Sequence, residues 1–99
     1  MITATAMKLI AERGNLCECC GMRQGVEAHH CLYRRDTHVK MLNDIENLQL
    51  VCRTCHDSTA KTRANRVTFW NDQCERYGKD HMVEWHDRVP YKVKEMEYK

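Results

Sequence analysis

Long apolar runs, proline and aromatic residues are scarce in this 99-residue sequence, which contains one proline and 7% aromatic residues. No apolar run approaches the roughly 18 residues that a membrane-spanning helix needs, so the sequence predicts no membrane segment and no membrane partner. Residues 1–14 hold too short an apolar stretch for a secretory signal. We therefore expect a cytoplasmic protein whose cysteines stay reduced.

A strong net charge is also lacking. The 16 Lys and Arg residues nearly balance the 14 Asp and Glu residues, which leaves a formal charge of +2. A value this small does not by itself indicate a nucleic-acid-binding protein, so a basic surface would have to arise from local clustering. Six basic residues gather near the paired histidines and the second cysteine pair: Arg34, Arg35, Arg53, Lys61, Arg63 and Arg66. A solvated face is the alternative interpretation of this cluster.

The core that this composition allows is thin. Charged residues make up 30% of the chain, the mean hydropathy is −0.72, and a chain of about 100 residues buries only roughly 60–65% of its unfolded surface. An additional stabilising element is expected in so small a domain. The seven cysteines could supply it as disulfides or as a metal site. Reducing surroundings and the odd number of cysteines favour the metal.

The N-terminal half of the chain predicts two strands between helices. A helix is expected over residues 3–13 with Gly14 after its end, and the second helix over about 54–65. One strand is expected over residues 26–33. The other is expected over 48–51, where the stretch LQLV alternates polar and apolar residues. A polar loop over 34–47 connects them, and its most favourable turn is at Asn43-Asp44.

The C-terminal part predicts a helical extension over residues 67–88. Four residues at helical spacing are expected to face the core in its first helix: Val67, Trp70, Cys74 and Tyr77. Gly78 ends that helix, and Asp80 could cap a second one that ends before Pro90. Residues 89–99 are charged and are expected to form a loose tail.

Four cysteines have the spacing of a zinc site. Cys17 and Cys20 form one C-x-x-C pair, Cys52 and Cys55 form another, and 31 residues separate the two pairs. Two such pairs can place four thiolates tetrahedrally around one structural zinc ion. Cys19 could replace Cys17 or Cys20 in this site. The two remaining cysteines, Cys31 and Cys74, are expected to be small buried apolar residues.

Three segments in a fixed order give the sequence a family resemblance. CECCG, VEAHHCLY and ENLQLVCRTCHDSTAKT resemble the HNH endonucleases, specifically the zinc-clipped form common in phages and bacteria, over about residues 17–62. The resemblance implies an α+β fold with a ββα-metal core, in which a two-stranded antiparallel hairpin and a helix are joined by the four-cysteine zinc clip. Helices would flank this core on both sides, in a single domain over residues 1–99.

The resemblance also implies site residues. His30 would be the general base, Asn47 would fix the loop and orient that base, and His29 and His56 would bind a catalytic divalent cation. Neighbouring side chains on a strand point to opposite faces, so His29 and His30 are expected to have different roles. Many relatives have an acid at position 29, and the histidine here would admit Ni²⁺ or Zn²⁺ beside Mg²⁺ or Mn²⁺.

Two features of this predicted metal site stay open. Some relatives have a third histidine at the position of Ala60, and Asp57 or His38 could compensate for its absence. His56 could instead replace Cys55 as a zinc ligand.

The expected activity is hydrolysis of DNA phosphodiester bonds, in which a monomer nicks with low sequence specificity and the six basic residues contact phosphates. A larger phage or recombination assembly is a candidate partner, and a phage-encoded protein would act in the cytoplasm of its bacterial host. Two other classes of function remain as alternatives. One is a non-catalytic zinc module that binds nucleic acid or a partner protein, and the other is a redox-sensing or metal-sensing thiol protein.

Overall fold

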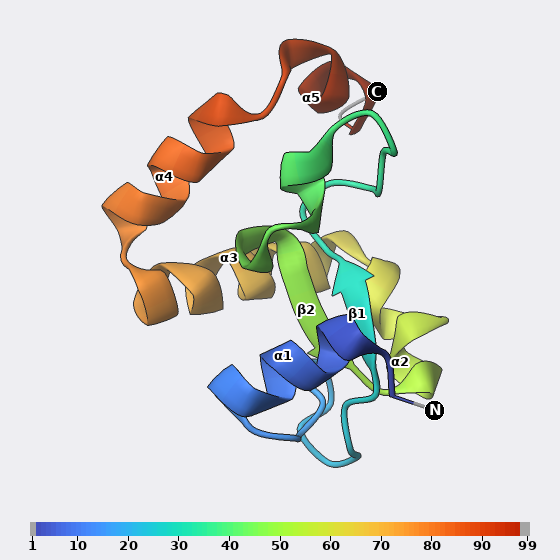
Figure 1. Ribbon diagram of the computed structural model, residues 1–99. Coiled ribbons are helices and arrows are strands. Elements are labelled where there is room, and N and C mark those ends of the chain that lie inside the picture. Colours follow the sequence, from blue (N-terminus) through green and yellow to red (C-terminus); the bar gives the residue numbers. More distant parts are fainter. Residues whose placement is uncertain (1, 98–99) are drawn as a thin grey trace.

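The computed structural model describes residues 2–97 and has an α+β fold built around one hairpin (Figure 1). The strands are β1 (Glu27–His30) and β2 (Leu48–Val51). The α-helices are α1 (Ala4–Arg13), α2 (Arg53–His56), α3 (Arg63–Tyr77), α4 (Lys79–Arg88) and α5 (Tyr91–Glu97). Three short 3₁₀ helices complete the fold: η1 (Lys40–Asn43), η2 (Ile45–Asn47) and η3 (Thr59–Lys61). The two-stranded antiparallel hairpin, the helices and a four-cysteine cluster confirm the predicted fold class.

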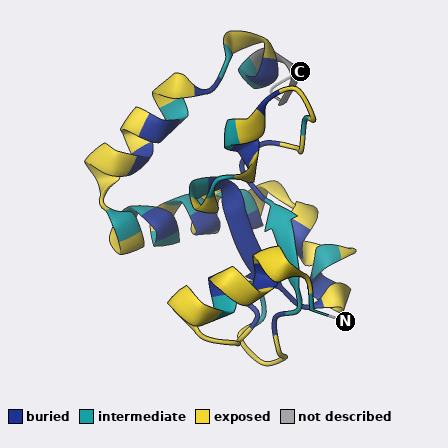
Figure 2. Ribbon diagram, viewed as in Figure 1, coloured by how far each residue is buried: buried dark blue, intermediate teal, exposed yellow. Residues whose placement is uncertain are grey.

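The hairpin pairs β1 with β2 in antiparallel register, with Glu27 opposite Val51 and His30 opposite Leu48. Every residue of β2 is buried, although its sequence alternates polar and apolar side chains (Figure 2). Leu48 and Leu50 pack against α1 on one side. On the other side Gln49 exchanges two hydrogen bonds with Asn65 of α3, of 3.1 and 2.8 Å. The polar residue is therefore buried because α3 supplies a matching amide.

Helix α1 begins and ends where the sequence predicts. The Thr3 hydroxyl accepts a hydrogen bond from the Ala6 N–H, and Gly14 follows the last turn with a φ of 90°. The last helical residue, Arg13, has a side chain that is only 2% exposed. It donates to Tyr77 O–H of α3 and to two backbone carbonyls at and before the start of β2, Ile45 O and Leu48 O.

The prediction of a single helix over residues 54–65 is wrong. The chain forms the four-residue helix α2, then η3, and α3 begins only at Arg63. Side-chain oxygens cause these breaks, because they compete with the backbone for hydrogen bonds. The Ser58 hydroxyl bonds Thr54 O, and the Thr62 hydroxyl accepts from Asn65 N–H as the cap of α3.

The core-facing side of α3 differs from the apolar stripe expected over Val67, Trp70, Cys74 and Tyr77. Val67 is 54% exposed, whereas the other three are partly buried and pack against the main core cluster, as the sequence predicts. The buried residues recur every four positions and are Asn65, Phe69 and Gln73. Two of these are polar and find hydrogen-bond partners, since Gln73 donates to Ile45 O and Glu46 O. A stripe that mixes amides with one aromatic ring is not visible as hydrophobic periodicity.

The C-terminal residues are more ordered than the sequence predicts. Gly78 precedes α4, and Asp80 lies in its first turn without capping it. The loose tail expected over 89–99 is instead helical from Tyr91 to Glu97, and residues 98 and 99 lie outside the described residues. Val89 and Val93 join the main core cluster, which also contains Met82 and Trp85 from α4 and Leu42 from η1. Within the described residues, no helix combines the length and the apolar character that a membrane crossing requires.

Candidate active site

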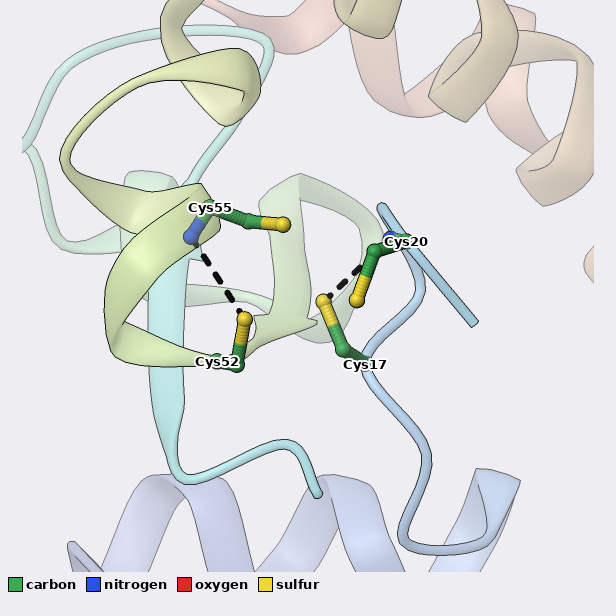
Figure 3. Close-up of side chains that lie close together, drawn as sticks. All are labelled: Cys17, Cys20, Cys52 and Cys55. Atoms are coloured by element: carbon green, nitrogen blue, oxygen red, sulfur yellow. Dashed lines mark hydrogen bonds between the residues drawn. The ribbon is translucent and has the colours of Figure 1, made fainter. Parts of the chain in front are cut away.

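The four cysteines of the two C-x-x-C pairs meet at the base of the hairpin (Figure 3). Their sulfur atoms all lie within 4.8 Å of one another. Cys17 and Cys20 come from the turn after α1, where Gly21 has a φ of 68°, while Cys52 and Cys55 come from the start of α2. The Cys20 N–H donates to Cys17 Sγ, and the Cys55 N–H donates to Cys52 Sγ, both at 3.5 Å.

This donor set fits a structural zinc ion. Four sulfurs so close together can share one cation with Zn–S bonds of about 2.3 Å. Backbone N–H groups of Met22 and Arg23 lower the pKa of the Cys20 thiol to about 6. Burial first, and then hydrogen bonds from the Cys55 thiol to Cys52 and the other cluster sulfurs, raise the pKa of Cys55, and repulsion by the charge of Cys17 adds to the rise. A divalent cation removes that repulsion, so the cluster is consistent with zinc.

The other cysteines do not belong to the cluster of four. Cys19 packs beside it, and its pKa is raised by burial. Cys31 is buried, and burial raises the pKa of its thiol to about 12. Cys74 is partly buried against the main core. Cys31 is therefore a buried residue, as the sequence predicts, and its thiol stays protonated near pH 7 although it borders the histidine pocket.

The cluster holds the hairpin in place beside a polar pocket of about 390 Å³. Backbone hydrogen bonds join the cysteine turn to β2, from Glu18 N–H to Leu50 O and from Val26 N–H to Val51 O. The pocket lies where the end of β1 meets the end of α2, η3 and the first turn of α3. Its lining includes three histidines and four basic residues: His29, His30, His56, Arg34, Arg35, Lys61 and Arg66.

His29 has a defined proton position. Its Nε2 lies 3.0 Å from the carbonyl oxygen of Ala60, which can only accept, so Nε2 carries the proton and Nδ1 keeps its lone pair. Burial is the main cause that lowers the pKa of His29 to about 4, and electrostatic coupling to His56 adds to it. The imidazole is therefore neutral near pH 7, which is the form that binds a metal ion.

His56 is oriented by a residue that sequence reasoning missed. The Nδ1 of His56 lies 3.0 Å from Oε1 of Glu27, so Nδ1–H donates to the carboxylate and Nε2 keeps its lone pair. The rings of His29 and His56 are 5.1 Å apart between centroids. A signal for Glu27 was present, because residues two apart on a strand share a face and Glu27 lies two before His29. His56 is not part of the cysteine cluster, which contains Cys55.

His30 faces a different partner from His29. Its Nε2 donates to Oδ1 of Asn43 in η1, at 2.8 Å. The sequence predicts Asn47 for this role, but Asn47 is fully buried and bonds loop backbone instead. Its amide oxygen accepts from Leu32 N–H and Tyr33 N–H, both at 2.9 Å, and its amide nitrogen donates to carbonyl oxygens of the same loop. Asn47 therefore fixes the loop, and Asn43, expected only as a turn residue, contacts His30.

The six basic residues are not all in one place. Arg34, Arg35, Lys61 and Arg66 line the histidine pocket, and Arg63 lies with Arg66 along a neighbouring groove. Arg53 has an 80% exposed side chain, and its guanidinium lies 3.7 Å from the Glu27 carboxylate. Ala60 contributes its carbonyl oxygen to His29. Asp57 and His38 are exposed and are not among the residues that line the pocket.

Comparison with known proteins connects this geometry to a family. Residues 17–62 match the family model described as HNH endonuclease. No curated protein and no solved structure matches the chain significantly. The matched residues span both cysteine pairs, His29, His30, Asn47 and His56. Residues 17–62 are therefore an HNH endonuclease family domain, and this domain implies nuclease activity.

Proposed function

We propose that the protein is a metal-dependent endonuclease that hydrolyses DNA phosphodiester bonds, with His30 as the general base. The observation that carries this proposal is the arrangement of three histidines in one basic pocket. The ring centroids of His29 and His56 lie 5.1 Å apart. One nitrogen of each ring is held by a hydrogen bond, to Ala60 O and to Glu27 Oε1 respectively. The third, His30, has a different hydrogen-bond partner and is available for proton transfer.

His29 and His56 would hold the catalytic cation through His29 Nδ1 and His56 Nε2, the two nitrogens whose lone pairs remain. When bound, the cation supplies positive charge that stabilises the phosphate oxygens during hydrolysis. Mg²⁺ or Mn²⁺ would serve, and two nitrogen ligands also admit Ni²⁺ or Zn²⁺. Glu27 holds the His56 ring in place through Nδ1, as carboxylates commonly do for metal-binding histidines.

His30 would remove the proton from the attacking water. Its Nε2–H donates to Asn43, so its Nδ1 is the atom with the lone pair that accepts this proton. The Asn43 oxygen also stabilises the imidazolium that forms, because Nε2–H remains bonded to it. General-base catalysis of this kind contributes roughly 10²–10⁴-fold to the rate.

The basic lining of the pocket would bind the phosphates on either side of the cleaved bond. Arg34, Arg35, Lys61 and Arg66 place positive charge around the histidines, and such contacts weaken steeply with salt. Phosphate contacts carry no base information, so we expect low sequence specificity. One such pocket per chain cuts one strand, so a monomer would nick duplex DNA. A phage or recombination assembly as partner remains a prediction from the resemblance.

A plasmid-nicking assay with Mg²⁺, Mn²⁺ and Ni²⁺ tests this function. Replacing His30 with Ala should slow nicking by roughly 10²–10⁴-fold while zinc content and melting temperature stay unchanged. His38→Ala is the matched control, because His38 is exposed and does not line the pocket. Nicking by His30→Ala at the parent rate would remove His30 from the mechanism. Absence of nicking by the parent protein with all three metals would contradict the proposed activity.

A further inference from the structure

A second groove of about 340 Å³ lies directly beside the histidine pocket, between α3 and α4. Its floor and walls are mainly apolar and include Leu32, Val67, Trp70 and Val83. Val67 and Val83 are 54% and 39% exposed. The proposed phosphodiester chemistry uses none of these side chains, so the groove needs an explanation of its own.

The groove adjoins the histidine pocket at one shared residue. Arg66 lines both hollows, and Arg63, one turn earlier on α3, lines the groove. Among the described residues that line the groove there is no Asp or Glu. The acidic residues of α4, Asp80, Glu84 and Asp87, line a neighbouring hollow that shares Val83 with the groove. An apolar surface with two arginines and no carboxylate is therefore adjacent to the site where a phosphate would bind.

We propose that this groove receives an unpaired nucleobase of the DNA strand that is being cut. This inference rests on the proposed function, since it is the phosphate backbone in the histidine pocket that brings the base to the groove. Proteins that bind single strands combine a positively charged track with aromatic side chains that contact the bases. Arg63 and Arg66 supply the charge, and Trp70 supplies the aromatic ring. The volume is at the small end of ligand pockets, roughly 300–1,000 Å³, and suits one nucleotide.

The chemistry of the occupant has a consequence for the substrate. A base inside an intact duplex is stacked and paired, so it can enter the groove only after leaving the stack, which costs free energy. DNA with single-stranded, bulged or frayed nucleotides does not incur that cost. The substrate class is therefore DNA with an unpaired nucleotide next to the cleaved phosphate, and fully paired DNA is the poorer substrate.

Tryptophan fluorescence provides a direct binding test without added catalytic metal. The chain has two tryptophans. Trp85 is 0% exposed in the core, whereas Trp70 lines the groove. A short single-stranded oligodeoxynucleotide should quench the emission, and the paired duplex of the same sequence should quench it less. The variant Trp70→Phe keeps an aromatic ring but should lose the quenching, because only Trp85 then emits.

A pair of charge variants tests the groove independently. Val67→Glu places a carboxylate in the groove, where it repels the strand, and should weaken single-strand affinity roughly five-fold or more, a loss comparable with that of one base–aromatic contact. Met7→Glu is the matched control, because Met7 is 59% exposed on α1 and lines neither hollow. With Mg²⁺ or Mn²⁺ added, Val67→Glu should also reduce the preference for a bulged duplex over a paired one, and Met7→Glu should preserve it.

The outcomes separate this proposal from the catalytic one. Equal quenching by single strand and duplex would overturn the groove proposal, as would equal affinities for Val67→Glu and Met7→Glu. Saturation of the groove by an apolar peptide that oligonucleotides cannot displace would also overturn it, in favour of a partner protein. If oligonucleotides quench Trp70 but no DNA is cut, the groove proposal stands and the catalytic function fails.

Discussion

Glu27 Oε1 lies 3.0 Å from Nδ1 of His56, and this contact joins the first strand of the hairpin to the helix that follows the second. The carboxylate fixes both the ring orientation and the proton position of His56. A histidine that is held in this way presents Nε2 to the pocket without the entropic cost of orienting the ring. The bond therefore connects a residue without an obvious role in the sequence to the proposed metal site.

Replacing Glu27 with Ala should weaken binding of the catalytic metal. Loss of a carboxylate that orients a metal-binding histidine typically costs 10–100-fold in affinity or activity. The measurement is the Mn²⁺ concentration that gives half-maximal nicking, with Glu84→Ala as control because Glu84 is exposed on α4. Glu27→Gln should retain part of the affinity, since its amide oxygen can still accept from Nδ1–H. Unchanged metal dependence in Glu27→Ala would show that His56 is oriented without this contact.

Two asparagines of the same loop should behave differently when each is replaced by Ala. Asn43 is exposed and bonds His30, so Asn43→Ala should lower the nicking rate with little change in melting temperature. Asn47 is fully buried and bonds backbone groups of the loop, and a buried group left unsatisfied costs about 1–3 kcal/mol. Asn47→Ala should therefore melt at a clearly lower temperature. The reverse pattern would restore to Asn47 the orienting role that the sequence predicts.

Removing the predicted structural zinc should unfold the domain. Structural zinc sites contribute roughly 10–16 kcal/mol of apparent binding free energy in small metal-folded peptides, more than most domains of this size have in total. Cys20→Ser should lose zinc and show reduced helical circular dichroism. Cys74→Ser, which lies outside the cluster, should keep both. Full helical content in a zinc-free protein would mean that the cysteines pack without a metal.

The stability of the protein without catalytic metal should fall as the pH decreases from about 6.5 towards 4. The pKa of His29 is lowered to about 4 in the folded protein, mainly by burial, whereas an unfolded histidine titrates near 6.5. Between these values the unfolded chain binds a proton that the folded chain does not, so protonation favours unfolding. The stabilisation is complete above pH 6.5 and declines on acidification.

Comparison with His29→Gln isolates this effect, because both proteins contain the same cysteine cluster. Urea unfolding at several pH values should show that the free energy of unfolding of the parent decreases more steeply below pH 6.5 than that of His29→Gln. Parallel curves for the two proteins would show that His29 does not titrate in this range.

Features of this structure that depend on local spacing were predictable from sequence. The four cysteines, the hairpin strand over 48–51 and the first helix follow from motifs and caps that span a few residues. It was not possible to predict in the same way the contacts of Glu27 and Asn43 or the buried face of α3. Their roles depend on hydrogen bonds across 13 to 29 residues of sequence, such as His30 with Asn43 and His56 with Glu27. A polar side chain with a distant partner looks like a surface residue until the fold is known.

The buried side chain of Arg13 has a consequence for protein engineering. It bonds carbonyl oxygens of residues 45 and 48 inside the family-matched segment and Tyr77 beyond it, although Arg13 itself precedes that segment. The matched residues 17–62 are therefore not a transplantable module. A fusion that carries only those residues would expose the apolar side of β2 and remove the guanidinium that bonds both carbonyl groups. We therefore expect a portable unit to begin before Arg13 and to extend past Tyr77.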